Sequence, residues 1–161
     1  MNMSENNNST DNSKQEEIQN QDEIQNWDDI KMKEDILRGI YAIGFEAPSP
    51  IQKKSLGPMI GKNDLIAQAQ SGTGKTGAFT IGALNIIDVN INKTQAVILS
   101  PTRELSLQTH SVLKSIGGFM EKLRIKLLIG GVSSESDQKE IKSKVPHIIV
   151  GCPGRTFDMM R

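Results

Sequence analysis

Hydrophobic residues along this chain recur in two alternating patterns, one typical of amphipathic helices and one typical of buried strands. Helical spacing predicts helices over residues 33–45, 50–61, 75–89, 102–121 and 134–142, with a last helix beginning near residue 154. Short aliphatic and β-branched runs predict buried strands over residues 64–68, 96–99, 125–129 and 147–150. Such alternation is typical of an α/β fold in which helices cover both faces of a parallel sheet.

The first 26 residues lack either pattern and consist mostly of Asn, Gln, Ser, Asp and Glu. A segment of this composition cannot bury enough apolar surface to offset the entropy lost on ordering. We therefore expect a disordered tail over residues 1–26 and a single partial domain over residues 27–161.

Charge and cysteine content exclude few classes of protein. The 19 basic and 19 acidic residues balance, so no overall positive field indicates nucleic acid, although a local groove could still bind it. The single cysteine excludes an internal disulfide. No secretory leader and no apolar run of the roughly 18 residues needed to span a bilayer is present. We expect an intracellular protein, either cytoplasmic or nuclear.

A glycine-rich turn between a predicted strand and a predicted helix carries the clearest chemistry. Residues 69–76 have the spacing of a Walker A phosphate loop, with Ala69 in place of the usual first glycine. Gly72 and Gly74 let backbone N–H groups point at phosphate oxygens, and the following helix presents its amino terminus to the same anion. Lys75 supplies a point charge for the outer phosphates, and the Thr76 hydroxyl is placed to coordinate Mg²⁺. A plain strand-to-helix turn is the alternative, but the flanking elements favour phosphate binding.

Three further unusual turns follow predicted strands, at residues 101–104, 130–131 and 152–155. In open parallel sheets ligands bind beyond the carboxyl ends of the strands. We therefore expect these turns and the phosphate loop to form one functional face.

Residues 44–52, Gly-Phe-Glu-Ala-Pro-Ser-Pro-Ile-Gln, precede the phosphate loop. Ser49 and Pro50 are typical of a helix start, and the Gln52 amide can both donate to and accept from an adenine edge. This segment resembles the Q motif of the DEAD-box RNA helicases, with Trp27 at the place of the family's isolated upstream aromatic residue. Pro-Thr-Arg-Glu-Leu at 101–105, Gly-Gly at 130–131 and Cys-Pro-Gly-Arg at 152–155 resemble further motifs of that family. Within the family, these motifs are most similar in sequence to those of translation initiation factor 4A and its close relatives.

The resemblance covers nearly all of residues 27–161 and implies a RecA-like parallel sheet, an incomplete amino-terminal helicase domain that binds ATP, Mg²⁺ and RNA. It implies that Gln52 reads adenine, that Phe45 packs on the base, and that the phosphates are held by Ser71, Gly72, Thr73, Gly74, Lys75 and Thr76. It also implies an RNA track that grips the sugar-phosphate backbone without sequence preference, formed by Pro101, Thr102, Arg103, Gly131, Gly154 and Arg155. Scaffold or initiation-factor proteins are further partners that it suggests. Without the resemblance, Arg103 and Glu104 would be interpreted as helix-capping residues and Arg155 as a solvated charge.

The sequence departs from the family at two points. Cys152 stands where the family has threonine, and a thiol is a weaker partner for a phosphate oxygen than a hydroxyl. The sequence contains no Asp-Glu-Ala-Asp, so the acidic groups that the family uses on Mg²⁺ and the attacking water are missing. We expect no useful ATP hydrolysis or unwinding by these 161 residues, and an open, aggregation-prone sheet edge where the corresponding strand would pair.

Two other functions stay open at this point. The chain could act as a non-catalytic module that binds nucleotide or RNA and competes with a full-length helicase. It could also be an unrelated P-loop enzyme such as a small kinase, which the matches to RNA-gripping motifs disfavour.

Overall fold

The computed structural model describes residues 24–131 and 133–161. The predicted disordered tail, residues 1–26, lies almost entirely outside the described residues, and the proposed division at residue 26 stays a prediction. Within the described residues no helix is both long enough and apolar enough to cross a membrane.

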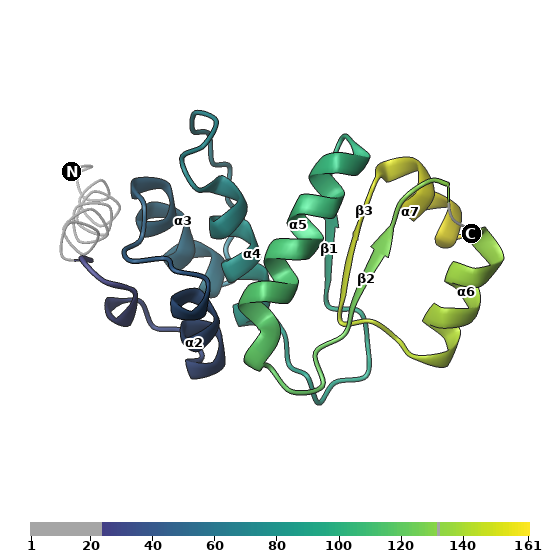
Figure 1. The fold of residues 1–161 in the computed structure, drawn as a ribbon, viewed down its shortest axis with the longest axis horizontal. Helices are drawn as coiled ribbons and strands as arrows, with labels where there is room; N and C mark the ends of the chain where they lie inside the picture. The colour runs from purple at the N-terminus through teal and green to yellow at the C-terminus, as the bar shows by residue number, and fades with distance from the viewer. Residues whose placement is uncertain (1–23, 132) are drawn as a thin grey trace, which may run out of the picture.

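From Lys75 onward, helices and strands alternate as the hydrophobic pattern predicts, whereas three α-helices follow one another in the earlier part of the described chain (Figure 1). Most of the predicted boundaries are confirmed to within a few residues, and the segment over 102–121 divides into an α-helix and a short 3-10 turn. The elements are η1 (Trp27–Asp29), α2 (Glu34–Ala42), α3 (Pro50–Ile60), α4 (Lys75–Ile86), β1 (Ala96–Leu99), α5 (Arg103–Ile116), η2 (Gly117–Phe119), β2 (Ile125–Leu128), α6 (Ser134–Ser143), β3 (Ile148–Gly151) and α7 (Pro153–Met159).

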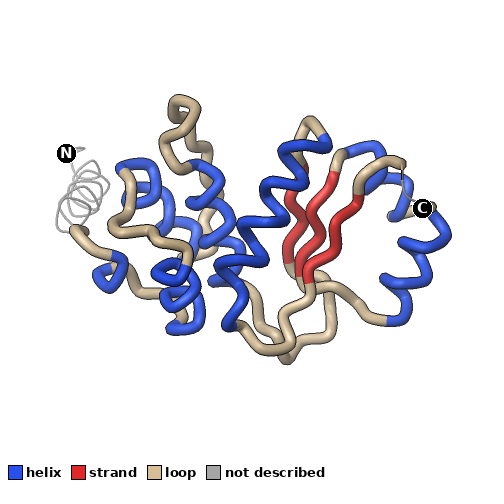
Figure 2. Tube along the Cα trace, viewed as in Figure 1, coloured by secondary structure: helices blue, strands red, loops and turns tan. Residues whose placement is uncertain are grey.

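The three described strands form a parallel sheet in the order β1-β3-β2. In register, Leu99 of β1 lies opposite Gly151 of β3, which lies opposite Leu128 of β2. Helix α5 packs against β2 and β3, and α6 and α7 lie on the other side of the sheet (Figure 2). The predicted α/β class with helices on both faces is confirmed.

The main hydrophobic core lies between the sheet and α2, α4 and α5. Trp27 anchors the beginning of the described chain to this core, because its side chain is completely buried and its Nε1 donates to the backbone oxygen of Phe45 at 3.1 Å. The two aromatic rings stack with their centroids 6.3 Å apart. This arrangement fixes residues 44–52 next to the phosphate loop.

The predicted buried strand over residues 64–68 is wrong. These residues have no strand pairing, and Ile66 is 100% exposed. A hydrophobic run forms a buried strand only when a neighbour supplies backbone partners and apolar cover, and among the described residues β1 pairs with β3 alone.

The other side of β1 is correspondingly open. Val97 and Leu99 are 52% and 54% exposed, and they line an apolar groove of about 850 Å³ together with Phe79 and Ala83 of α4. The exposure of these β1 side chains agrees with the expectation of an uncovered sheet edge.

Candidate nucleotide and RNA site

Two glycines of the glycine-rich loop adopt backbone conformations that other residues rarely adopt. Gly72 and Gly74 adopt φ values of 79° and 96°, in the left-handed region that glycine tolerates best. Gly74 immediately precedes α4, a 12-residue helix whose amino terminus therefore opens onto the loop. Helix amino termini carry unsatisfied N–H groups and partial positive charge, so this end of α4 attracts anions.

Lys75 points back into the loop that precedes it. Its Nζ donates to the backbone oxygen of Ala69 at 2.5 Å and also to that of Gln70. Thr73 Oγ1 donates to the same Gln70 oxygen at 2.8 Å, which tightens the turn. The loop thus closes around a cation, and phosphate oxygens would offer this ammonium group stronger acceptors than the neutral carbonyls.

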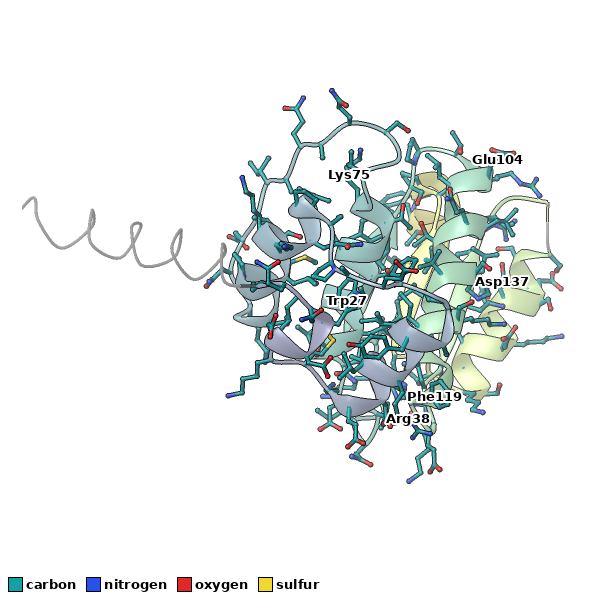
Figure 3. All side chains as sticks on the ribbon, turned by 60° about the vertical axis from the view of Figure 1, so that its left-hand side comes forward. Trp27, Arg38, Lys75, Glu104, Phe119 and Asp137 are labelled. Atoms are coloured by element: carbon teal, nitrogen blue, oxygen red, sulfur yellow. The ribbon has the colours of Figure 1, made fainter. Side chains whose placement is uncertain are left out.

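Lys75 and Thr76 line a cavity of about 610 Å³. Ser100 and Pro101, which follow β1, line the same cavity. Pro101 therefore lies on the phosphate-loop side of the site, although the family resemblance grouped it with the RNA track. In the view of Figure 3, Lys75 and Glu104 both lie near the upper border of the molecule.

Gln52 joins residues 44–52 to the phosphate loop. Its Oε1 accepts from the Ser49 backbone N–H at 2.7 Å, and its Nε2 donates to the Gly74 backbone oxygen at 3.2 Å. The residue is only 4% exposed. Each end of the amide keeps one further bonding position, because NH₂ has a second hydrogen and the oxygen a second lone pair. The reading of adenine by Gln52 stays a prediction.

Phe45 also reaches this junction. A Cβ added at Gly77 of α4 would lie 2.6 Å from Gln52 Nε2 and 3.3 Å from Phe45 Cε2. Both side chains therefore occupy the space that a larger residue at position 77 would need. Gln52 thus contacts the last residue before α4, and Phe45 lies beside the first turn of that helix; the packing of Phe45 on a base stays a prediction.

A second hollow, of about 470 Å³, lies at the carboxyl ends of β2 and β3 and is here called the arginine hollow. Its lining residues are Arg103, Gly130, Cys152, Gly154, Arg155, Phe157 and Asp158. Gly131 adjoins it: its φ is 90°, and an added Cβ would lie 3.0 Å from Nη1 of Arg103. Four of the predicted RNA-track residues are thus brought together, namely Arg103, Gly131, Gly154 and Arg155.

Thr102 is predicted to contact RNA, but its hydroxyl has a local task in the structure. As the N-cap of α5 it accepts a hydrogen bond from the Leu105 backbone N–H at 3.3 Å. A cap of this kind fixes the direction in which α5 leaves the turn. Thr102 therefore positions Arg103, the first residue of that helix.

Sequence reasoning missed two contacts beneath the arginine hollow. Cys152 Sγ lies 3.6 Å from the hydroxyl of Ser106, which is fully buried on α5. Asp137 of α6, also buried, forms ion pairs with Lys126 of β2 and Arg155 of α7. No local pattern in the sequence links residues so far apart, although Asp137 in the first turn of a polar helix could be noted as a favourable charge.

Fold and geometry together define a class: a parallel α/β protein with a glycine-rich loop at the start of a helix and a hollow lined by two arginines at the carboxyl ends of its strands. The chain matches the DEAD/DEAH box helicase family over residues 49–161, and it belongs to that family. It is 49% identical over 129 residues to the ATP-dependent RNA helicase eIF4A of Pyricularia oryzae, and 48% identical to the ATP-dependent RNA helicase FAL1 of Mycosarcoma maydis. Each match covers 80% of this chain and 32% of the relative.

Solved structures agree with this assignment. Dbp5 of S. cerevisiae bound to RNA and ADP BeF3 has a TM-score of 0.75 and 36% identity, with 84% of this chain and 34% of that chain covered. A DEAD box protein from Methanococcus jannaschii has a TM-score of 0.74 and 33% identity, covering 83% and 36%. The RecA-like fold and the family membership predicted from the sequence are confirmed. The chain spans about a third of the length of the curated relatives that it matches.

Proposed function

We propose that this chain binds ATP with Mg²⁺ and the backbone of RNA, as the nucleotide- and RNA-binding part of an ATP-dependent RNA helicase. The observation that supports the proposal is the position of two hollows at the carboxyl ends of the strands. Lys75 and Thr76 line one cavity together with Ser100 and Pro101, which follow β1, and the arginine hollow lies at the carboxyl ends of β2 and β3. Relatives of this chain are named ATP-dependent RNA helicases, and the structure of Dbp5 has been solved with bound RNA and ADP BeF3.

On the nucleotide side, the loop amides and Lys75 would hold the phosphates. The Thr76 hydroxyl would ligate Mg²⁺, an ion that neutralises phosphate charge when bound. Oxygens of the bound nucleotide would supply further Mg²⁺ ligands beside Thr76.

On the RNA side, Arg103 and Arg155 would contact phosphates, and the backbone at Gly131 and Gly154 would permit close approach. Such contacts position a strand without reading its bases, so we propose sequence-independent binding. Cys152 would contribute less than a threonine hydroxyl, because a thiol is a weak donor.

Hydrolysis requires groups that activate water and stabilise the transferring phosphoryl. The 161-residue sequence contains no Asp-Glu-Ala-Asp. We propose that these residues by themselves bind ATP and turn it over no faster than background. Phosphate release by the purified chain that Lys75→Ala abolishes would contradict this part of the proposal.

The test of nucleotide binding is titration of a fluorescent ATP analogue with Mg²⁺ into the chain and two variants. Lys75→Ala removes the ammonium group from the loop and should weaken binding about tenfold or more, since charge-assisted hydrogen bonds to phosphate are strong. Lys93→Ala removes an exposed lysine elsewhere and should bind normally. Equal binding by all three proteins would refute the phosphate-loop assignment, provided that circular dichroism shows them folded.

A further inference from the structure

A buried cluster of charges lies beneath the arginine hollow. Asp137 of α6 is only 2% exposed, and its carboxylate contacts cations from two other elements. Oδ1 lies 2.9 Å from Nζ of Lys126 on β2, and Oδ2 lies 3.6 Å from Nη1 of Arg155 on α7. Burial of a carboxylate is costly unless cationic partners of this kind contact it.

The two cations have different surroundings. Lys126 also forms an ion pair with Glu140, whose side chain is 63% exposed. Burial by itself lowers the pKa of Lys126, but hydrogen bonds and charges from Glu140 and Asp137 together outweigh it, so the pKa is raised above its usual value. Lys126 is therefore charged at neutral pH and has a second carboxylate of its own.

Arg155 contacts Asp137 but also lines the arginine hollow with Arg103 and Gly154. Its separation of 3.6 Å from Asp137 exceeds the 2.7–2.9 Å that is usual for a short charge-assisted hydrogen bond. The carboxylate thus attracts the guanidinium from below at moderate range, while the hollow lies on the solvent side. Arg155 is 13% exposed, so its direction is set chiefly by what it touches inside the protein.

From this geometry we propose that Asp137 is a positioning residue for RNA binding. It holds the Arg155 guanidinium in the orientation that presents N–H groups to an RNA phosphate in the arginine hollow. Lys126 neutralises the remaining charge of the carboxylate, so that Asp137 does not repel the strand. The inference rests on the proposed RNA function of the hollow and names the group that organises it.

A simple charge argument predicts the opposite effect of substitution. Removing a negative charge near an RNA site should strengthen binding, because the local potential becomes more positive. If Asp137 positions Arg155, Asp137→Asn should weaken binding instead. The direction of the change therefore separates positioning from bulk electrostatics.

The experiment measures binding of a fluorescently labelled oligouridylate by anisotropy at low salt, with the full 161-residue chain. We expect Asp137→Asn and Arg155→Ala each to weaken binding about fivefold to tenfold. The double variant should be no weaker than Arg155→Ala, since both changes remove the same contact. Glu140→Gln is the matched control: it removes a charge from the same cluster without touching Arg155, and it should bind as tightly as the wild type or more tightly.

Thermal melting and binding of the ATP analogue verify that each variant is folded. If Asp137→Asn does not fold, Asp137→Glu retains the charge and displaces the carboxylate, and it should weaken RNA binding through the same coupling to Arg155. Unchanged or tighter binding by the folded Asp137 variant, or effects that add to those of Arg155→Ala, would overturn the positioning role alone. Absence of RNA binding by the wild-type chain would overturn the RNA assignment together with this inference.

Discussion

Gly77 provides a sharp test of how the phosphate loop and residues 44–52 are joined. Gly77 lies in α4, where alanine is normally more stable than glycine by about 1 kcal/mol. At this position, however, an added Cβ would lie 2.6 Å from Gln52 Nε2 and 3.3 Å from Phe45 Cε2. Gln52 would have to move, and its hydrogen bond to the Gly74 oxygen would be lost.

The change in the free energy of unfolding combines two destabilising contributions and one stabilising contribution. Forcing an extra carbon into a packed site costs about 1–3 kcal/mol, and loss of one buried hydrogen bond costs about 1 kcal/mol. After subtraction of the helix preference, Gly77→Ala should lower the free energy of unfolding by about 1–3 kcal/mol. Affinity for the ATP analogue should fall as well, because Gln52 and Gly74 belong to the same junction.

Urea unfolding gives the measurement. The chain has one tryptophan, Trp27, which is completely buried and stacks on Phe45, so its fluorescence reports on this region. Gly118→Ala is the matched control, because a Cβ there meets nothing within 4 Å. If Gly77→Ala stabilises the protein as much as Gly118→Ala does and binds the ATP analogue normally, Gln52 does not occupy the place described here.

Two further predictions concern pH and the sheet edge. Burial, followed by the charge of Arg124, lowers the pKa of His147 below its usual value of 6.5, and burial followed by Lys114 does the same for His110. The stability that the neutral rings contribute should therefore be complete above pH 6.5 and be lost as the pH falls through the lower folded-state values. Urea unfolding midpoints between pH 7.5 and 5.5 should show this decline. His147→Asn can keep an acceptor for the Arg124 backbone N–H, and this variant should make the midpoint less dependent on pH. An unchanged dependence of the midpoint on pH would contradict the assignment to His147. At the open edge of β1, Val97→Lys should reduce self-association measured by light scattering. Leu107→Lys introduces the same charge at an exposed site of α5 and should have less effect. Equal effects would show that net charge, not the strand edge, controls association.

Much of the site could be predicted from local sequence because its chemistry is local. Residues 69–76 contain the glycines, the lysine and the hydroxyl that a phosphate loop needs, and positive φ values at Gly72 and Gly74 agree with that composition. The helix over 50–60 begins at the expected Ser49 and Pro50, because capping depends on neighbouring residues. The strand over residues 96–99 was likewise evident from four consecutive aliphatic residues.

Tertiary structure decided what depends on distant partners. Residues 64–68 have the composition of a buried strand, yet they lie exposed because no described strand pairs with them. Gln52 Nε2 donates to the Gly74 backbone oxygen, a contact that only the approach of α3 to the phosphate loop reveals. The cluster of Lys126, Asp137 and Arg155 joins β2, α6 and α7, and long-range contacts of this kind follow from packing of the elements and not from periodicity along the chain. The sequence by itself thus determined which chemical groups are present and in what order, while the tertiary structure decided which of them meet and which are buried.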